Sequence, residues 1–350
     1  MPQAQRIHVV VVGCGAIGSF VLPLLARVPG ITRITLVDHD TYQPSNLRGQ
    51  LIFPCDVGQP KVAVQARRLR TLNPDLDVAA ILAPVEDVPL GLLRANVLLA
   101  GVDSRQARQS VNEIAWRLGI PWIDSGVLES AQLARVNVYV PGADAPCLEC
   151  AWDERDYAAL VAEYPCGAVA AQSPSDTSSA LAALASSLQA IELQKIMCGD
   201  AEHAAIGRQV TVDARSHRLL STSFCRNPNC RFDHQSWSIA PLRCSLQRLT
   251  VAEALALTGP LRVAGHRFAR QMVCSRCGFR LDGLRLDRPR GRCPKCRVRL
   301  ITPGFDALLD QLDASLPPEC LNRSLAQVGL APGDVICGVD KKFELVPEVI

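Results

Sequence analysis

The sequence predicts an α/β protein whose core is a doubly wound, mainly parallel sheet. Apolar strand-like runs alternate with amphipathic helical patterns, which is typical of a parallel sheet with helices on both faces. A glycine-rich turn directly follows the first of these runs. The expected strands are residues 7–12, 34–38, 78–82, 97–100, 135–140 and 209–213, and the expected helices are residues 61–72, 105–118 and 178–198.

The domain organisation follows from where this alternation stops. A chain of 350 residues is long for one domain, and the strand–helix pattern ends near residue 235. We therefore expect a core domain of residues 1–235 and a C-terminal extension of residues 236–350. Within residues 262–299, twelve Lys and Arg stand against two Asp, a net charge of +10, while the whole chain has only +3.

The composition excludes several classes of protein. With 48% hydrophobic and 20% charged residues, the chain is neither disordered nor fibrous, and the net charge of +3 speaks against a globally basic nucleic-acid binder. The apolar stretch of residues 7–28 is interrupted by glycines, so it predicts a strand, a turn and a helix and not a membrane span. Since the N-terminus lacks a signal-peptide pattern, we expect a cytoplasmic protein without membrane association.

Cysteine spacing predicts a metal site in the extension. The chain has 15 cysteines, several in close pairs, and in a reducing compartment such pairs favour metal over disulfides. Cys274 and Cys277 are followed after fifteen residues by Cys293 and Cys296, which is the spacing of a zinc ribbon at about residues 270–300. Four thiolates fill a tetrahedral zinc site, so we expect a structural zinc. A small β-containing tail is expected after the ribbon.

The glycine-rich turn predicts a nucleotide site. Gly13, Gly15 and Gly18 form a GxGxxG pattern between a strand and a helix, where backbone N–H groups approach a phosphate. Asp38 ends the second strand, at the position of a ribose-binding carboxylate. A nicotinamide-dependent oxidoreductase shares these features and is the first rival interpretation.

A longer motif separates the interpretations. Residues 38–50 read DHDTYQPSNLRGQ, residues 56–61 read DVGQPK and residues 72–74 read LNP. Over about residues 7–235 the chain resembles the ubiquitin-activating enzymes and the bacterial ThiF and MoeB adenylyltransferases. This resemblance implies a Rossmann-like fold, the use of ATP and Mg²⁺, a homodimer, and a ubiquitin-like or sulfur-carrier protein as partner.

The resemblance also assigns roles to residues of the site. It implies that Asp38 and Asp40 contact ribose and that Asp103 holds magnesium. The family usually reads Asn-Leu-x-Arg-Gln, whereas Gly49 here occupies the arginine position and Arg48 stands one place earlier. Either Arg48 replaces that arginine, or the charge compensation comes from elsewhere. The residues implied around the triphosphate are Asn46, Arg48, Gln50 and Lys61.

A second zinc site is implied by the same resemblance, because relatives carry a structural zinc in this part of the core. The expected ligands are Cys147, Cys150, Cys225 and Cys230. Four residues separate the second pair where the family has two, so His234 is an alternative ligand.

We expect ATP-dependent adenylation of the C-terminal glycine carboxylate of a ubiquitin-like protein. Cys166 lies between the first cysteine pair and the long helix, where relatives place a reactive cysteine. We predict that Cys166 accepts the carrier as a thioester and passes it to a conjugating enzyme. The alternatives are a sulfur-carrier adenylyltransferase of thiamine or molybdopterin-type biosynthesis and a catalytically silent scaffold. For the basic extension, docking of an acidic protein is favoured over nucleic acid and over a merely solvated surface.

Overall fold

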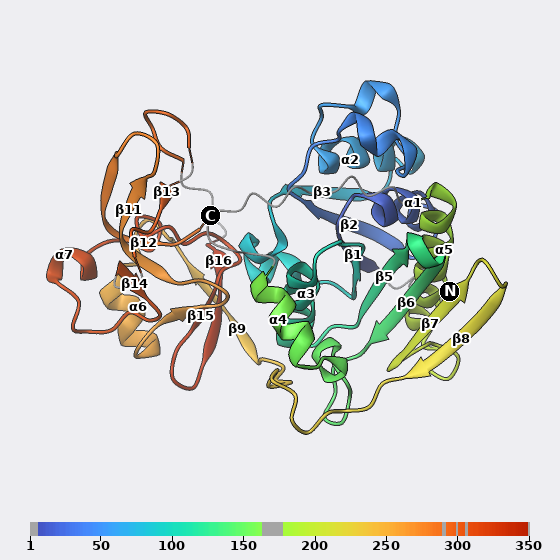
Figure 1. Ribbon diagram of the computed structural model, residues 1–350. Coiled ribbons are helices and arrows are strands. Elements are labelled where there is room, and N and C mark those ends of the chain that lie inside the picture. Colours follow the sequence, from blue (N-terminus) through green and yellow to red (C-terminus); the bar gives the residue numbers. More distant parts are fainter. Residues whose placement is uncertain (1–5, 163–177, 289–291, 299, 305–306, 349–350) are drawn as a thin grey trace. The chain divides into compact units, whose positions relative to one another are not determined.

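The computed structural model describes residues 6–162, 178–288, 292–298, 300–304 and 307–348. The chain forms two units, each shown in Figure 1. The first unit comprises Met1–Glu86 and Arg94–Ser236, and the second comprises Asp87–Leu93 and Trp237–Ile350. None of the described helices is long and apolar enough to cross a membrane.

The first unit is built on an eight-stranded sheet of order β3-β2-β1-β4-β5-β6-β7-β8. The strands from β3 to β5 are parallel, and those from β5 to β8 pair antiparallel. The doubly wound, mainly parallel fold is therefore confirmed. The strands are β1 (Ile7–Val12), β2 (Ile31–Asp38), β3 (Asp77–Leu82), β4 (Val97–Ala100), β5 (Trp122–Leu128), β6 (Leu133–Tyr139), β7 (Arg208–Asp213) and β8 (Arg218–Ser223).

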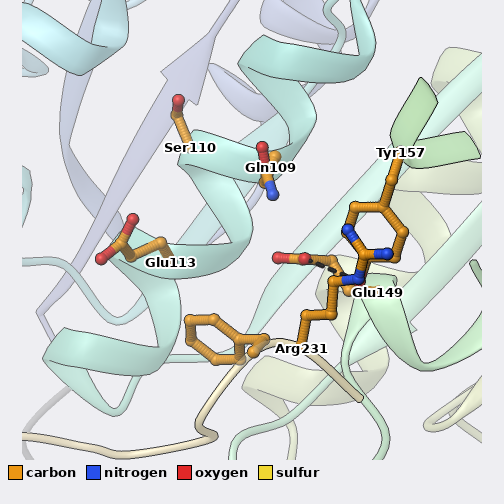
Figure 2. Close-up of a pocket in the computed structure, with 7 residues that line it drawn as sticks. Gln109, Ser110, Glu113, Glu149, Tyr157 and Arg231 are labelled. Carbon is orange, nitrogen blue, oxygen red and sulfur yellow. Dashed lines mark hydrogen bonds between the residues drawn. The ribbon is translucent and has the colours of Figure 1, made fainter. Parts of the chain in front are cut away.

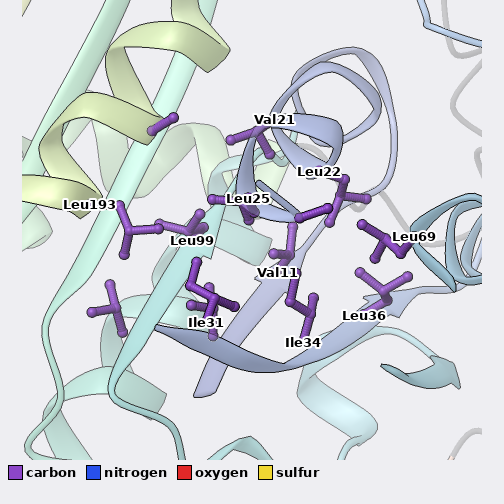
Figure 3. Close-up of a cluster of buried hydrophobic side chains, with 14 of the residues drawn as sticks. Val11, Val21, Leu22, Leu25, Ile31, Ile34, Leu36, Leu69, Leu99 and Leu193 are labelled. Carbon is purple, nitrogen blue, oxygen red and sulfur yellow. The ribbon is translucent and has the colours of Figure 1, made fainter. Parts of the chain in front are cut away.

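Helices cover the sheet because its central strands are apolar on both faces. Val9 and Val11 of β1 belong to a buried cluster with side chains of α1, α2 and α5, such as Leu22, Leu69 and Leu193 (Figure 3). Val10 and Val12, which alternate with them, are also buried, as a strand covered on both faces requires. The helices are α1 (Ala16–Leu25), α2 (Lys61–Leu72), α3 (Arg105–Leu118), α4 (Glu154–Ala162) and α5 (Ser179–Met197).

The strand order reverses between β1 and β4. Backbone hydrogen bonds link the carboxyl end of β1 to both of its neighbours. The Gly13 N–H donates to the Val37 carbonyl of β2, 2.9 Å, and the Gly101 N–H, just after β4, donates to the Val12 carbonyl of β1, 2.9 Å. In open α/β sheets ligands bind at such a reversal, outside the carboxyl ends of the strands. The fold thus places the glycine loop where a ligand is expected.

The second unit has two small sheets and its own core. One sheet has the order β10-β15-β16-β9; in the other, β11 lies between β12 and β13 and also pairs with β14. Phe268, Val251 and Leu345 are fully buried in one cluster of this unit. Its elements are β9 (Ile239–Cys244), α6 (Val251–Thr258), β10 (Arg262–Val263), β11 (Phe268–Cys274), β12 (Arg280–Leu286), β13 (Leu300–Ile301), β14 (Leu308–Leu309), α7 (Pro318–Leu321), β15 (Val335–Cys337) and β16 (Lys342–Pro347).

Candidate functional site

The glycine loop between β1 and α1 is tightly packed. Gly13 has φ +92°, and a Cβ there would lie 2.6 Å from the carbonyl oxygen of Gly101. A Cβ on Gly18 would lie 2.0 Å from the carbonyl oxygen of Gly13. Both positions therefore exclude a side chain, and the loop backbone is held against the ends of β4 and α1.

A buried carboxylate fixes the loop. Asp38 accepts hydrogen bonds from the backbone N–H of Cys14, 2.6 Å, and of Asp40, 2.8 Å. From the other side, the Tyr42 hydroxyl donates to the Cys14 carbonyl, 2.8 Å, and accepts from Gln65 Nε2, 2.7 Å. Burial raises the pKa of Tyr42, so its hydroxyl stays a neutral donor. Tyr42 and Gln65 were not expected from the sequence, although Tyr42 lies within the family motif.

Three polar residues expected at the triphosphate or ribose converge in front of this loop. A Cβ built on Gly15 would lie 3.9 Å from Gln50 Nε2 and 4.0 Å from Lys61 Nζ. Lys61 Nζ in turn pairs with Asp40 at 2.8 Å. Gln50 Oε1 is buried and has no hydrogen-bond partner among the described residues. Backbone N–H groups, the Lys61 ammonium and the Gln50 Nε2 donor at one point form a surface that fits a polyphosphate.

The other expected residues lie further out. Asn46 Oδ1 accepts from the Gln43 N–H, 2.9 Å, and so caps the short helix Pro44–Arg48. Arg48 is exposed, and within the described part of the chain it makes no hydrogen bond or ion pair. Asp103 is exposed beyond the end of β4, outside a group of Asp38, His39 and Asp40 whose ligand atoms lie within 4.8 Å of one another.

A buried ion-pair group on β5, β6 and α3 was not expected from the sequence. Asp124 is 0% exposed and pairs with Arg108 Nε at 3.0 Å and Arg135 Nη1 at 2.8 Å. A Cβ on Gly126 would lie 3.3–3.4 Å from both guanidinium groups, so the glycine lets them approach. Arg108 also donates to the Val102 carbonyl beside Asp103, 2.5 Å. The group carries one positive charge in excess next to the end of β4.

Three cysteines and one histidine form a candidate metal centre in the first unit. The ligand atoms of Cys147, Cys150, Cys230 and His234 lie within 4.8 Å of one another, with His234 Nε2 3.2 Å from Cys150 Sγ. His234 Nδ1 lies 2.6 Å from the Phe232 carbonyl, to which it donates, so Nε2 is left with a lone pair facing the thiols. Three sulfurs and one nitrogen are a common set for structural zinc.

This set differs from the expected cysteines at one position. Cys225 is exposed and lies outside the cluster, and His234, the alternative ligand, is in the fourth position. The reason lies in the preceding residue: Phe224 stacks on Tyr139, centroids 5.8 Å apart, and its N–H donates to the Gly207 carbonyl, 2.7 Å. Cys225 is thereby held at the end of β8, while the turn that follows brings Cys230 to the other cysteines.

A cavity of about 410 Å³ lies beside this centre and not at the glycine loop. Figure 2 shows Arg231 over Tyr157, 4.0 Å from the guanidinium carbon to the ring centroid, with Glu149 beside them. Glu149 Oε2 accepts from the Tyr157 hydroxyl, 3.0 Å, and burial raises the pKa of Glu149. The lining residues are Gln109, Ser110, Glu113, Glu149, Tyr157, Arg231 and Phe232, several of which neighbour the candidate ligands in sequence.

The second unit brings together the four expected ribbon cysteines. The sulfur atoms of Cys274, Cys277, Cys293 and Cys296 lie within 4.8 Å of one another. The two loops that carry them are closed alike: Cys274 N–H donates to the Phe279 carbonyl and Cys293 N–H to the Val298 carbonyl, each 2.8 Å. Such paired loops hold four thiolates around one ion. Cys166, the predicted thioester acceptor, lies outside the described residues.

Fold and site together define a glycine-loop α/β protein of nucleotide-binding architecture. Residues 1–232 match the ThiF family, and the chain belongs to this family. It is 30% identical over 240 residues to the sulfur carrier protein adenylyltransferase of Thermus thermophilus, covering 65% of this chain and 82% of that protein. It is 32% identical over 158 residues to the ubiquitin-like modifier-activating enzyme 5 of Oryza sativa, covering 41% of this chain and 37% of that enzyme.

Solved structures show the same fold. The crystal structure of Escherichia coli MccB with ATP superposes with a TM-score of 0.53 at 25% identity, over 65% of this chain and 67% of that chain. The family match ends at residue 232, so residues 237–350 of the second unit lie beyond the part that defines the family.

Proposed function

We propose that this chain uses ATP to adenylate the C-terminal carboxylate of a small carrier protein of the ubiquitin-like or sulfur-carrier class. The observation that carries the proposal is the convergence of Gly15, Gln50 and Lys61 at the strand reversal of a ThiF-family fold. The names of the relatives from Thermus and rice support this class of substrate.

The chemistry needs charge compensation more than proton transfer. A C-terminal carboxylate is already ionised at pH 7, so its oxygen attacks the α-phosphorus of ATP without a general base. A carboxylate–phosphorus bond forms, the bond to the β-phosphate oxygen breaks, and pyrophosphate leaves. Lys61 and the loop N–H groups offset charge on the phosphates, and Asp38 and Tyr42 keep the loop in place.

Magnesium supplies further charge compensation when it is bound with ATP. Asp38, Asp40 and the exposed Asp103 are acidic residues at this edge of the sheet. Asp103 is our candidate ligand, since Asp38 already accepts two backbone bonds and Asp40 pairs with Lys61. Among the residues that the structure describes, Arg48 has no partner that holds it away from a bound triphosphate, which suits the replacement of the family arginine missing at Gly49.

The two cysteine-containing clusters are proposed as structural zinc sites. Each presents four ligand atoms, so neither leaves an open position for catalysis. Thioester formation on Cys166, transfer to a conjugating enzyme and a homodimeric state complete the proposal for a conjugation system. Sulfur transfer is the second candidate, because the Thermus relative is matched over most of its length.

Pyrophosphate exchange tests the activity. With a carrier protein ending in Gly-Gly, labelled pyrophosphate enters ATP, and Lys61→Ala lowers the rate by about 100-fold or more because a preorganised cation is lost. Lys341→Ala, an exposed lysine of the second unit, is the matched control and leaves the rate unchanged. Equal exchange by Lys61→Ala refutes the role of Lys61, and exchange without carrier, or none with any carrier, refutes the proposed reaction.

A product assay separates conjugation from sulfur transfer. A reductant-sensitive adduct on non-reducing gels that disappears in Cys166→Ala supports the thioester. A carrier that gains a thiocarboxylate with a sulfur donor, with no such adduct, supports sulfur transfer instead.

A further inference from the structure

The tip of the zinc-ribbon module, defined here as the two cysteine loops 274–280 and 292–298, gathers cations. Arg276, Arg292, Lys295 and Arg297 are each adjacent in sequence to a cysteine of the cluster. Because the four sulfurs lie within 4.8 Å of one another, these four side chains start from one small region. All four are exposed.

The described part of the protein does not neutralise these cations. The module's ion pairs lie elsewhere, between Arg267 and Asp310 and between Arg288 and Asp334. Within the described residues, no acidic side chain pairs with the four tip cations. Both aspartates within residues 262–299 have other partners, since Asp282 accepts a hydrogen bond from Gln271 and Asp287 accepts one from Thr302.

A zinc ion held by four thiolates leaves a charge of −2, which four adjacent cations exceed. Stabilising the metal therefore accounts for only part of the positive charge. The tip keeps a net positive charge of about +2, and Arg280 at the start of β12 adds to it.

The apolar residues of the tip are half-buried. Phe279 and Val298 of the tip, and Leu281 next to it, pack against the buried cluster of Met272 and Leu300. Among the described residues of 270–298, no large hydrophobic side chain is exposed, and the first beyond them is Ile301. Protein interfaces have an apolar, aromatic-rich centre, whereas contacts with phosphate backbones consist of cations and polar groups.

We propose that the ribbon tip binds the phosphate backbone of a nucleic acid. This reverses the preference for an acidic protein partner that the sequence suggested, because the structure shows charge without an exposed apolar centre. No aromatic side chain is exposed among the described residues 262–298, so base stacking is absent and binding is independent of sequence. The proposal does not depend on the adenylation reaction.

Salt-dependent binding tests the proposal on the full chain. Fluorescence anisotropy with a labelled 20-base-pair DNA duplex, the same RNA duplex and a 20-nucleotide single strand is measured at 50, 100 and 200 mM NaCl. The slope of log K against log salt is negative, and each lost phosphate contact reduces its magnitude by about 0.9 for duplex DNA. Three lost contacts thus lower the slope by about 2.7, which makes the wild-type affinity about 40-fold more salt-sensitive than the variant's over this range.

The variant removes three tip cations, and its control removes three exposed arginines elsewhere. Arg297 has φ +61° and corresponds to Gly278, φ +67°, in the other loop, so glycine is the substitution its backbone tolerates. The variant is Arg276→Gln/Lys295→Gln/Arg297→Gly, and the control is Arg215→Gln/Arg218→Gln/Arg243→Gln.

We expect the tip variant to lose the steep salt dependence, and the control to keep it, at equal zinc content and equal pyrophosphate exchange. The proposal is overturned if the variant and the wild type bind equally, or if the wild type does not bind at 50 mM NaCl. It is also overturned, in favour of an acidic protein partner, if poly-glutamate displaces the duplex at equal charge concentration. If the triple variant loses zinc, Arg276→Gln and Lys295→Gln are measured singly, each with an expected slope change of about 0.9.

Discussion

Replacing His234 distinguishes the metal centre seen in the structure from the four-cysteine set of the sequence motif. His234 Nε2 lies 3.2 Å from Cys150 Sγ, and the ring is fixed by the Phe232 carbonyl and by edge contact with Trp116, centroids 4.9 Å apart. Binding of structural zinc is worth on the order of 10–16 kcal/mol, so one of four ligands accounts for about 3 kcal/mol, or about 100-fold in affinity.

The assay is competition with a chromophoric chelator, together with zinc content after dialysis. We expect two zinc ions per chain in the wild type and in Cys225→Ser, whose thiol lies outside the cluster. In His234→Ala one ion becomes about 100-fold easier to remove while the ribbon ion stays. The reverse result, with zinc lost in Cys225→Ser and retained at wild-type affinity in His234→Ala, refutes the assignment.

Three further predictions concern the loop, a buried histidine and the ribbon. Gly18→Ala places a Cβ 2.0 Å from the Gly13 carbonyl oxygen, so we expect loss of ATP binding and a lower melting temperature. In Gly15→Ala the Cβ has no neighbour closer than 3.9 Å, so this variant folds normally and only its ATP binding is impaired. Calorimetry with and without ATP distinguishes the two outcomes. Burial and Arg288 lower the pKa of His266 to about 4, below the unfolded value of about 6.5. Between pH 4 and 6.5 the unfolded chain therefore binds more protons than the folded chain, so the stability that neutral His266 contributes is present above pH 6.5 and declines toward pH 4. In His266→Gln we expect the denaturation midpoint to fall less over this pH range than in the wild type. An identical fall contradicts the assignment. Cys274→Ser should make the second unit protease-sensitive while ATP binding persists, and unchanged cleavage would argue against a stabilising metal.

Local sequence patterns predict those features that depend on neighbouring residues. The bounds of α2 and α3 agree with the helical patterns at residues 61–72 and 105–118, since both helices have a buried face of regular period. The fold class and the position of the glycine loop are also confirmed, because both depend on patterns of neighbouring residues. Strand β8 was not expected, because its six residues are all exposed and show no apolar alternation.

Features that depend on residues far apart in sequence could not be predicted. The hydrogen bond from Tyr42 to the Cys14 carbonyl spans 28 residues, and no local pattern indicates it. His234, 84 residues after Cys150, was named only as an alternative ligand, and the structure places it 3.2 Å from Cys150 Sγ. Asp124 had no recognisable pattern, because its two arginine partners come from a helix and a neighbouring strand. A motif names Gln50 and Lys61, but only the structure shows that they meet at Gly15. Their roles, and that of Cys166, stay predictions.

The segment Asp87–Leu93 gives the chain an unusual connectivity. Although it lies within the first 100 residues, it belongs to the second unit, where the N–H of Gly91 donates to the Gly333 carbonyl, 2.8 Å, and Leu92 packs at Gly333. The chain therefore passes between the units three times. A single cut after Ser236 does not separate two complete modules: the first fragment keeps a piece of the second unit, and the released fragment lacks the partner of Gly333. The second unit is thus not a removable C-terminal appendage, and a chain truncated at residue 236 leaves Gly91 and Leu92 without their contacts at Gly333.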